Sequence, residues 1–279
     1  MQVTIVGWAG SFPGPDSPAS CYLIEAGDFR LVLDLGNGAL GALQRYTALS
    51  DVDAICLSHL HADHCIDMIG YSVFQNYHPD GTQPRIPVYG PSGAEDRLAL
   101  ALGPQSKGMA EAFEFAALAP GTIEIGPLRV TTAWMQHPVE TFGFRIEHAG
   151  QVVAYSADTG PCDELVTLAR DADVLLAEAS FTNGTELPPG LHLTARQAAE
   201  HAARAGAAEL VLTHLVPWND PAISQAEAAA AYDGPLRLAS SGLRLLGADR
   251  AGPGAGRARP GAGPGAGPAR PGAGPAAGT

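Results

Sequence analysis

Three histidines and an aspartate stand close together in the segment LSHLHADHCID, residues 57–67. They are His59, His61, Asp63 and His64, and they directly follow an apolar run. In an extended chain, residues two apart point to the same side, so His59 and His61 can present imidazole nitrogens to one metal ion. The chain is expected to turn into a helix near Asp63 and His64, which aims those side chains at a second ion. The spacing therefore predicts a metal site.

Three further residues of ligand type each follow a predicted strand. His137 comes after LRVTTAWMQ, Asp158 after VVAYSA, and His214 after ELVLT. Taken singly, each is better explained as a surface histidine or a turn aspartate. Because strand ends gather around a shared site, all three can converge on the histidine-rich segment and complete it. Considered with that segment, they favour a metal centre with two ions.

The chain resembles the metallo-β-lactamase superfamily over almost all of residues 1–247. The resemblance is carried by SHLHADH, a downstream histidine, the aspartate of YSADTGP and the histidine of LTHL. Within the superfamily the chain is most similar to the phosphodiesterase branch, which contains ribonuclease Z and small bacterial cyclic-nucleotide phosphodiesterases. The segments YSADTGPCDEL, LLAEASF and HLTARQAAEHA…ELVLTHL parallel that branch in the same order. The resemblance implies an α+β fold: a single-domain, four-layer αββα sandwich with two metals at one edge of its sheets.

The resemblance also implies seven metal ligands, one of which bridges the two ions. The first ion would be held by His59, His61 and His137, the second by Asp63, His64 and His214, and the bridge would be Asp158. Imidazoles and carboxylates suit zinc, and manganese or iron would tolerate the same set. Two divalent ions roughly 3.5–4 Å apart can share a hydroxide and clamp a phosphodiester during in-line attack. We therefore expect two divalent cations, zinc first, and a hydrolase that uses the bridging hydroxide.

Three side chains are expected to serve the reaction itself. Asp63 would ligate one ion and also orient the attacking hydroxide as its hydrogen-bond acceptor. By the resemblance, His192 would donate a proton to the leaving oxygen. Glu178, at the end of VLLAE, would hold His192 in the useful tautomer and raise its pKa. The competing explanation for His192 is a surface histidine. For Glu178 it is a buried carboxylate at a strand end that pairs with another residue.

Other residues near the cluster have weaker claims. Asp34 in LVLDLGNG resembles the family's early D-x-G, where it would support the ligands, and a plain turn aspartate explains it equally well. Ser58 stands beside a ligand and can bond phosphate or backbone, whereas Cys65 is expected to be a small packing residue. The glycine-rich GWAGSFPG, residues 7–14, lacks Gly-x-Gly spacing and no helix pattern follows, so we expect no dinucleotide site there.

The substrate is expected to be a small-molecule phosphodiester such as a cyclic nucleotide. Ribonuclease Z carries a long arm that grips transfer RNA, inserted before the bridging aspartate, but here only PVETFGFRIEHAGQVVAYSA separates His137 from Asp158. The chain has 16 Lys+Arg against 29 Asp+Glu, a net charge of −13, so long nucleic acid should bind poorly. The alternatives are ribonuclease Z-like RNA 3′-end processing, hydrolysis of a thioester or lactone, and metal binding without turnover.

These residues must be positioned by strands and helices that the pattern also predicts. QVTIVG, SCYLIEAG and FRLVLDLG are β-rich runs, GALGALQRYTAL has helical spacing, VDAICLSH is a strand, and CIDMIGYSVFQNY is helical again. The last third alternates helix and strand in DELVTLARDA, DVLLAEAS, TARQAAEHAARAG and ELVLTH. Thr194 with Gln197 forms a capping box and Gly206 ends that helix. Layered sheets flanked by helices follow from this order.

Composition sets the remaining expectations. Residues 251–279 contain only Ala, Gly, Pro, Arg and a terminal Thr, so we expect a hydrolase domain over 1–247 and a Gly/Pro/Ala-rich disordered tail over 248–279. No leader and no run long enough to cross a bilayer is evident, which predicts a cytoplasmic protein without membrane contact. The four cysteines show no disulfide spacing. Relatives often dimerise, so a homodimer is one expected state.

Overall fold

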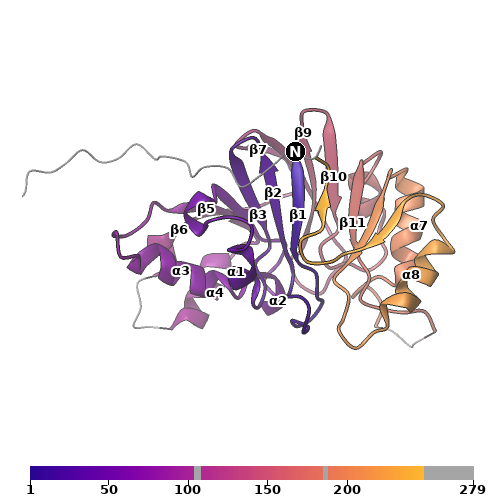
Figure 1. Ribbon diagram of the computed structural model, residues 1–279, viewed down its shortest axis with the longest axis horizontal. Helices are drawn as coiled ribbons and strands as arrows, with labels where there is room; N and C mark the ends of the chain where they lie inside the picture. Colours follow the sequence, from indigo (N-terminus) through magenta and orange to yellow (C-terminus); the bar gives the residue numbers. More distant parts are fainter. Residues whose placement is uncertain (104–107, 185–187, 248–279) are drawn as a thin grey trace, which may run out of the picture. The chain divides into compact units, whose positions relative to one another are not determined.

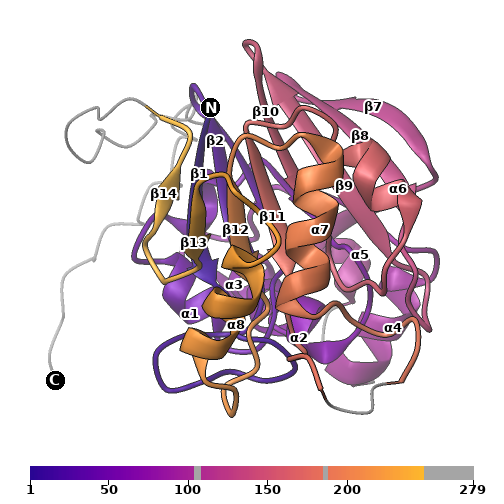
Figure 2. The same cartoon turned by 90° about the vertical axis from the view of Figure 1, so that its right-hand side faces the viewer.

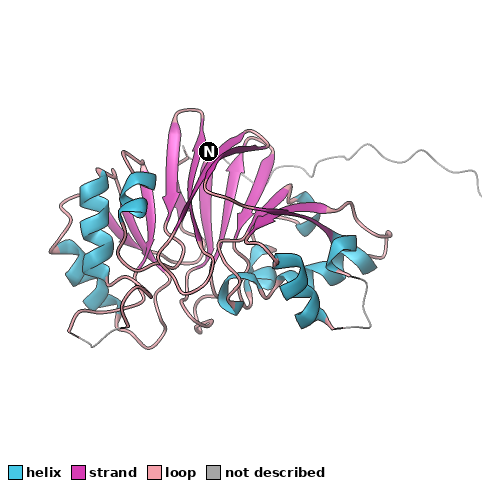
Figure 3. Ribbon diagram, turned by 180° about the vertical axis from the view of Figure 1, so that it is seen from behind, coloured by secondary structure: helices cyan, strands magenta, loops and turns pink. Residues whose placement is uncertain are grey.

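Two seven-stranded sheets form the centre of the part of the chain that the structure describes. The computed structural model describes residues 1–103, 108–184 and 188–247, and Met1–Asp249 form one compact unit. The predicted tail at 248–279 lies outside the described residues, so its disorder and the domain boundary at 247 stay predictions. Strands occupy the middle of this unit and helices cover it on both flanks (Figure 3).

The first sheet has the strand order β14-β1-β2-β3-β4-β5-β6. Its strands β1, β2 and β14 pair in antiparallel fashion, β2 pairs antiparallel with β3, and β3 through β6 run parallel. The members are β1 (Gln2–Gly7), β2 (Cys21–Ala26), β3 (Phe29–Leu33), β4 (Ala54–Cys56), β5 (Ile86–Gly90), β6 (Phe113–Ala117) and β14 (Arg244–Leu245).

The second sheet has the order β13-β12-β11-β10-β9-β8-β7. Strands β7 to β10 pair antiparallel, and β10 to β13 run parallel. The members are β7 (Gly121–Ile125), β8 (Leu128–Trp134), β9 (Phe142–His148), β10 (Gln151–Tyr155), β11 (Val174–Glu178), β12 (Leu210–Thr213) and β13 (Leu236–Leu238).

Helices cover the outer face of each sheet. The first sheet is covered by α1 (Ala39–Leu43), α2 (Ala62–Cys65), α3 (Met68–Tyr77), α4 (Ala94–Leu102), α5 (Met109–Ala112) and a 3-10 turn at Leu49–Asp51. The second sheet is covered by α6 (Asp163–Leu168), α7 (Ala195–Ala205) and α8 (Pro221–Ala229). Figure 1 shows α1, α3 and α4 on one flank and α7 and α8 on the other, and Figure 2 shows α7 and α8 in front of their sheet.

The apolar strands have two buried faces because each sheet lies between another sheet and a helix layer. In β2, Tyr22 and Ile24 point into the core between the sheets, whereas Cys21 and Leu23 pack beneath the helices. This alternation follows from the period of two along a strand. It explains why the strands are continuous apolar runs rather than alternating ones. The predicted α+β, αββα arrangement is confirmed.

The local signals in the last third of the chain are confirmed in detail. The Thr194 side chain accepts a hydrogen bond from the Gln197 backbone N–H, and the Gln197 side chain accepts one from the Thr194 N–H. Gly206 ends α7 with φ 67°, a left-handed conformation that glycine adopts without strain.

The run GALGALQRYTAL differs from its prediction as one helix. Only Ala39–Leu43 is α-helical, and the chain continues through turns to the 3-10 segment Leu49–Asp51. Gly38 and Gly41 lower the helix propensity of so short a segment, and Thr47 adds a β-branched side chain at its far end. The apolar residues have helical spacing, but the stretch that favours a helix is too short for the helix to extend beyond Leu43.

Replacing Phe144 by alanine should destabilise the fold by about 3–5 kcal/mol, because its ring lies fully buried in the core between the sheets. Urea unfolding followed by circular dichroism measures this change. Leu100→Ala on α4, where the side chain is 80% exposed, is the control and should change the free energy of unfolding by less than about 0.5 kcal/mol. Equal effects of both variants would contradict the assignment of this core.

Candidate metal centre

Asp63 and His64 lie in α2, whereas the other predicted ligands and the supporting residue Asp34 lie beyond the carboxyl ends of strands from both sheets. Asp34 follows β3 and His59 follows β4, in the first sheet. In the second sheet Asp158 follows β10 and His214 follows β12 directly, and His137 follows β8, which runs in the same direction as β10 because both are antiparallel to β9. Parallel strands therefore bring these polar residues to one edge, as the sequence predicted.

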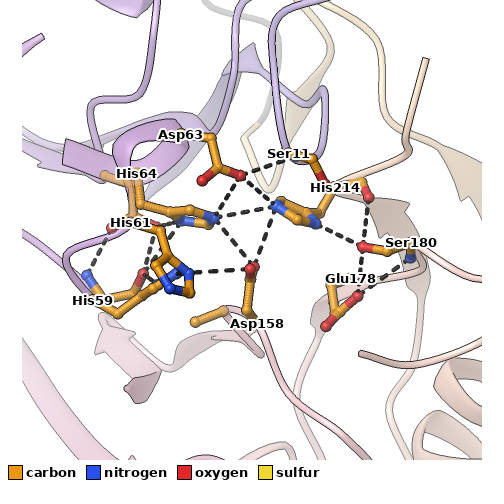
Figure 4. A network of polar contacts seen from close by, with 12 residues as sticks. Ser11, His59, His61, Asp63, His64, Asp158, Glu178, Ser180 and His214 are labelled. Atoms are coloured by element: carbon orange, nitrogen blue, oxygen red, sulfur yellow. Dashed lines mark hydrogen bonds and ion pairs between the residues drawn. The ribbon is translucent and has the colours of Figure 1, made fainter. Parts of the chain in front are cut away.

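The structure brings all seven predicted metal-ligand side chains together in two overlapping groups. Within each group the candidate ligand atoms lie within 4.8 Å of one another. One group is His59, His61, His137 and Asp158, and the other is Asp63, His64, Asp158 and His214. Asp158 belongs to both, and Figure 4 shows its carboxylate pointing between His64 and His214.

The spacing of the ring nitrogens fits a shared cation. Nε2 of His59 is 3.0 Å from Nδ1 of His61, which is 3.3 Å from Nε2 of His137. In the second group, Nε2 of His64 is 3.2 Å from Nε2 of His214. Two nitrogens that each lie about 2.0–2.1 Å from a tetrahedral zinc are roughly 3.3 Å apart. The donor set and its spacing therefore suit a divalent metal.

The Asp158 carboxylate is buried among nitrogen atoms rather than in solvent. The residue is 2% exposed, and Oδ1 lies 3.1 Å from Nε2 of His64 and 3.3 Å from Nε2 of His214. Within the described part of the chain, Oδ1 has no regular hydrogen bond. A buried carboxylate oxygen without a donor is costly unless a cation compensates it. This atom therefore supports a bridging position between two ions.

Hydrogen bonds on the outer side fix two of the ligand histidines. Nδ1 of His64 is 2.8 Å from Oδ2 of Asp34, and Nδ1 of His137 is 2.9 Å from the Leu191 carbonyl oxygen. Both partners can only accept here, so each Nδ1 carries the hydrogen and each Nε2 keeps its lone pair for a metal.

Asp34 is held too firmly to be a plain turn aspartate. It is fully buried, with φ 59°. Its Oδ1 accepts the Ser58 backbone N–H at 2.7 Å, and its Oδ2 accepts the Ser58 hydroxyl at 2.8 Å and the Tyr155 hydroxyl at 2.9 Å. Ser58 thus bonds Asp34, and Asp34 orients His64. The supporting position expected from the family's D-x-G matches this geometry.

Glu178 and His192 form the expected pair beside the two groups. Oε1 of Glu178 is 2.9 Å from Nδ1 of His192 and also accepts the Thr159 N–H at 2.8 Å. Oε2 accepts the Ser180 hydroxyl at 2.9 Å, which leaves the Ser180 oxygen to accept from Nδ1 of His214 at 2.7 Å. Donors thus occupy both oxygens of the buried Glu178, although its ligand atoms and those of His192 and His214 also lie within 4.8 Å of one another.

The charges of the site move several pKa values in opposite directions. Burial lowers the pKa of His192, but the charge and hydrogen bond of Glu178 outweigh it and raise that pKa to about 9. Burial likewise opposes the charged form of His64, but the carboxylates of Asp158 and Asp34 raise its pKa well above the usual range. For His59, burial and the neighbouring His64 lower the pKa well below that range. The same carboxylates that favour a proton on His64 would favour a cation there.

Metal affinity should consequently weaken as the pH falls. A cation that binds Nε2 of His64 must displace a proton that two carboxylates hold, so below the raised pKa the apparent affinity should fall about tenfold per pH unit for each proton released. Zinc titration against a chromophoric chelator between about pH 6 and pH 8 measures this. An affinity independent of pH would contradict the assignment of His64 as a ligand.

Sequence reasoning missed Ser11, in the glycine-rich segment after β1. Its backbone N–H donates to Oδ2 of Asp63 at 2.9 Å, with φ 64°. The adjacent Gly10 lies against His214, where a Cβ atom would stand 2.5 Å from the carbonyl oxygen. Only glycine fits this approach, so the glycine-rich run was itself a usable signal. Figure 4 shows Ser11 beside Asp63.

Residues 30–215 match the family model described as "Beta-lactamase superfamily domain". The chain belongs to this superfamily. The match covers the first ligand segment and continues past His214, so it spans the whole metal centre of this β-lactamase superfamily member.

Several relatives in the superfamily match over most of their length. The protein Rv1339 of Mycobacterium tuberculosis (strain ATCC 25618 / H37Rv) is 43% identical over 242 residues, 85% of this chain and 88% of that protein. "Probable metallo-hydrolase YhfI" of Bacillus subtilis (strain 168) is 30% identical over 87% of this chain and 98% of its own. The crystal structure of YhfI superposes with a TM-score of 0.80, covering 88% of this chain and 99% of that one. A ribonuclease Z of Mycobacterium bovis (strain BCG / Pasteur 1173P2) is 29% identical over 85% of this chain and 95% of that protein.

The recognised superfamily and the fold are thereby confirmed. This superfamily member is a metal-dependent hydrolase, and its histidine and aspartate clusters indicate a divalent metal. Among the described residues there is no helix with the length and apolar character needed to cross a membrane.

Proposed function

We propose that the chain hydrolyses a small phosphodiester, such as a cyclic nucleotide, with the help of two divalent cations. Zinc is the metal that we favour. The observation that carries this proposal is the shared position of Asp158 in two ligand groups, with the Glu178–His192 pair directly beside them. Two bound cations would activate a water molecule and stabilise the negative charge on the phosphate oxygens. The ions would be held by His59, His61 and His137, by Asp63, His64 and His214, and by Asp158 between them.

Asp63 is proposed to orient the attacking water. Its Oδ2 accepts the Ser11 N–H and lies 3.1 Å from Nε2 of His214, so the carboxylate is fixed on two sides. Burial raises the pKa of Asp63, but its close polar contact with His214 and the nearby histidine charges lower it below the usual range. Asp63 therefore stays ionised at neutral pH and can orient, as a hydrogen-bond acceptor, a water molecule whose proton two bound cations would release to solvent.

His192 is proposed to protonate the leaving oxygen. Because Nδ1 is engaged with Glu178, Nε2 is the nitrogen that remains for the substrate. As the water oxygen forms its bond to phosphorus, the bond from phosphorus to the leaving oxygen breaks, and the Nε2 proton passes to that oxygen. With a cyclic nucleotide the ring opens, and the single product is a nucleoside monophosphate with a free hydroxyl; an acyclic diester gives a phosphomonoester and an alcohol. The imidazolium form needed for this step is favoured by the raised pKa of His192.

The span between His137 and Asp158 supports a small substrate over a long RNA. It is taken up by β9, β10 and the turn between them, where His148 pairs with Gln151. No room is left there for the arm that ribonuclease Z uses. The net charge of −13 also disfavours a phosphate backbone.

A substrate panel with metal control tests the proposal. We expect hydrolysis of 3′,5′-cyclic AMP and bis(p-nitrophenyl) phosphate by the zinc-loaded protein, loss of that activity after chelation, and its recovery when zinc or manganese is added. The same preparations are assayed on p-nitrophenyl phosphate, a thioester, a lactone and a precursor transfer RNA, with metal content measured by elemental analysis.

Each other outcome of the panel points to a different function. Turnover confined to the thioester or lactone would replace the phosphodiester proposal with hydrolysis of those bonds. Cleavage of precursor transfer RNA alone would favour RNA processing. Two bound ions without turnover of any ester would indicate a metal-binding protein, and undiminished phosphodiester cleavage by metal-free protein would refute the mechanism.

A further inference from the structure

We propose that Phe12 and Trp218 form an aromatic subsite beside the metal centre, which stacks on the base of a nucleotide substrate. This inference rests on the proposed phosphodiesterase function and narrows its substrate class to nucleotides. Two large aromatic side chains lie at the surface of the protein, outside its hydrophobic core. Phe12 is 39% exposed and Trp218 is 72% exposed.

The two rings lie against each other rather than independently in solvent. Their centroids are 5.0 Å apart and their planes are inclined by 41°. Phe12 comes from the loop after β1, and Trp218 from the loop between β12 and α8. The pair therefore presents a partly exposed apolar surface built by two distant segments.

A cavity of about 390 Å³ joins this surface to the reaction site. Its walls include Ser11, Phe181, Leu191, His192 and Trp218. The same cavity thus holds the proposed proton donor, the residue that bonds Asp63, and the exposed indole. Its volume lies within the roughly 300–1,000 Å³ typical of sites for small ligands.

Backbone hydrogen bonds tie both aromatic segments to the metal ligands. The Gly10 N–H donates to the Leu215 carbonyl at 3.0 Å, and the Leu215 N–H donates to the Trp8 carbonyl at 3.1 Å. Leu215 directly follows the ligand His214, and Phe12 directly follows Ser11. The position of the aromatic pair is therefore fixed relative to the point where the phosphate would bind.

A second tether holds Trp218 from its other side. The side-chain amide of Asn219 donates to the Ser180 carbonyl at 2.8 Å. Ser180 is the residue whose hydroxyl links Glu178 to His214. The loop that carries the indole is thus anchored to the network that positions the catalytic histidine, as expected for a preformed subsite.

The chemistry of this surface selects a nucleobase as the occupant. A base has a flat π-face that stacks on aromatic rings, and stacking needs no positive charge, which an acidic chain supplies poorly. The cations would take the phosphate, whereas the aromatic pair would take the opposite end of the same nucleotide. A phosphodiester without an aromatic group would gain nothing from these rings.

The test compares substrates with and without a base. We expect Trp218→Ala and Phe12→Ala to raise the KM for 3′,5′-cyclic AMP by about tenfold or more, with little change in kcat. The same variants should hydrolyse ribose 3,5-cyclic phosphate, which lacks the base, as wild type does. Trp218→Phe, which keeps a ring, should recover most of the affinity. Tyr77→Ala, which removes a 55% exposed ring at the end of α3, is the control.

Binding of AMP separates this inference from the proposed function. Calorimetry on the zinc-loaded protein should show AMP binding that weakens about tenfold in Trp218→Ala, while ribose 5-phosphate binds wild type and variant alike. If cyclic AMP is not hydrolysed but AMP shows this difference, the proposed reaction fails and the subsite stands. Equal losses for substrates with and without a base, or no loss for either, would overturn the subsite whatever the reaction is.

Discussion

Asp158→Asn should lower kcat/KM for a phosphodiester by about a thousandfold or more and should reduce the bound metal below two ions per chain. The change keeps the size of the side chain and removes only its negative charge. Asp158 lies in both ligand groups, so one substitution weakens both ions at once. Metal-ion stabilisation of a phosphoryl transition state is worth several kcal/mol, and about 1.4 kcal/mol corresponds to a factor of ten in rate.

The matched control for that substitution is Asp163→Asn. Asp163 begins α6, its side chain is 85% exposed, and it pairs with Arg204. An exposed ion pair contributes little, so metal content and kcat/KM should stay at the wild-type level. Steady-state kinetics and elemental analysis on the same preparations measure both effects. If Asp158→Asn keeps two ions and full activity, the bridging assignment is wrong.

His192→Ala should lower kcat for cyclic AMP by about 10²–10⁴-fold, the usual worth of a general acid. The loss should be much smaller with bis(p-nitrophenyl) phosphate, because nitrophenolate leaves without needing a proton. Metal content should stay unchanged, since His192 is not among the proposed ligands. The ratio of the two losses therefore reports proton donation and separates it from a general disturbance of the site.

The pH profile provides an independent check on His192. The donor must be protonated, so the wild-type rate for cyclic AMP should fall as the pH rises through the pKa of His192. That pKa is raised to about 9 by Glu178 in the metal-free site, and bound cations would lower it by repulsion. The alkaline limb should be absent in His192→Ala. His78→Ala, in the loop after α3, serves as a control. An equal loss of kcat for cyclic AMP and for bis(p-nitrophenyl) phosphate in His192→Ala would contradict the proton-donor role.

The metal centre could be anticipated from the sequence because its signals are local. Three histidines at short spacing identify the first segment, and Asp158 and His214 follow short apolar runs that the pattern predicts to be strands. Parallel pairing then makes their convergence a property of the topology, since the carboxyl ends of neighbouring strands share an edge. The assignment of each residue to an ion came from the family resemblance and remains a prediction.

The supporting residues could not be found in the same way. The family's D-x-G suggests a supporting role for Asp34, but a turn aspartate explains it equally well until its partner Tyr155, 121 positions away, is placed beside it. Ser180 gains its role only when β11 and β12 lie side by side and bring Glu178 next to His214. These contacts join segments with no common sequence pattern, so only the assembled structure identifies them.

The metal centre lies across the seam between the two sheets. Its residues after β3 and β4 belong to one half of the sandwich, and those after β8, β10 and β12 belong to the other. A cation held there would be bound by residues from both sheets, so its complete set of ligands exists only when both halves have folded and packed together. By mass action, a substitution that destabilises the packing between the two sheets must also lower the affinity for metal, even when it lies far from the metal centre. The metal content per chain therefore reports the fraction of molecules in which the two halves are folded and packed together.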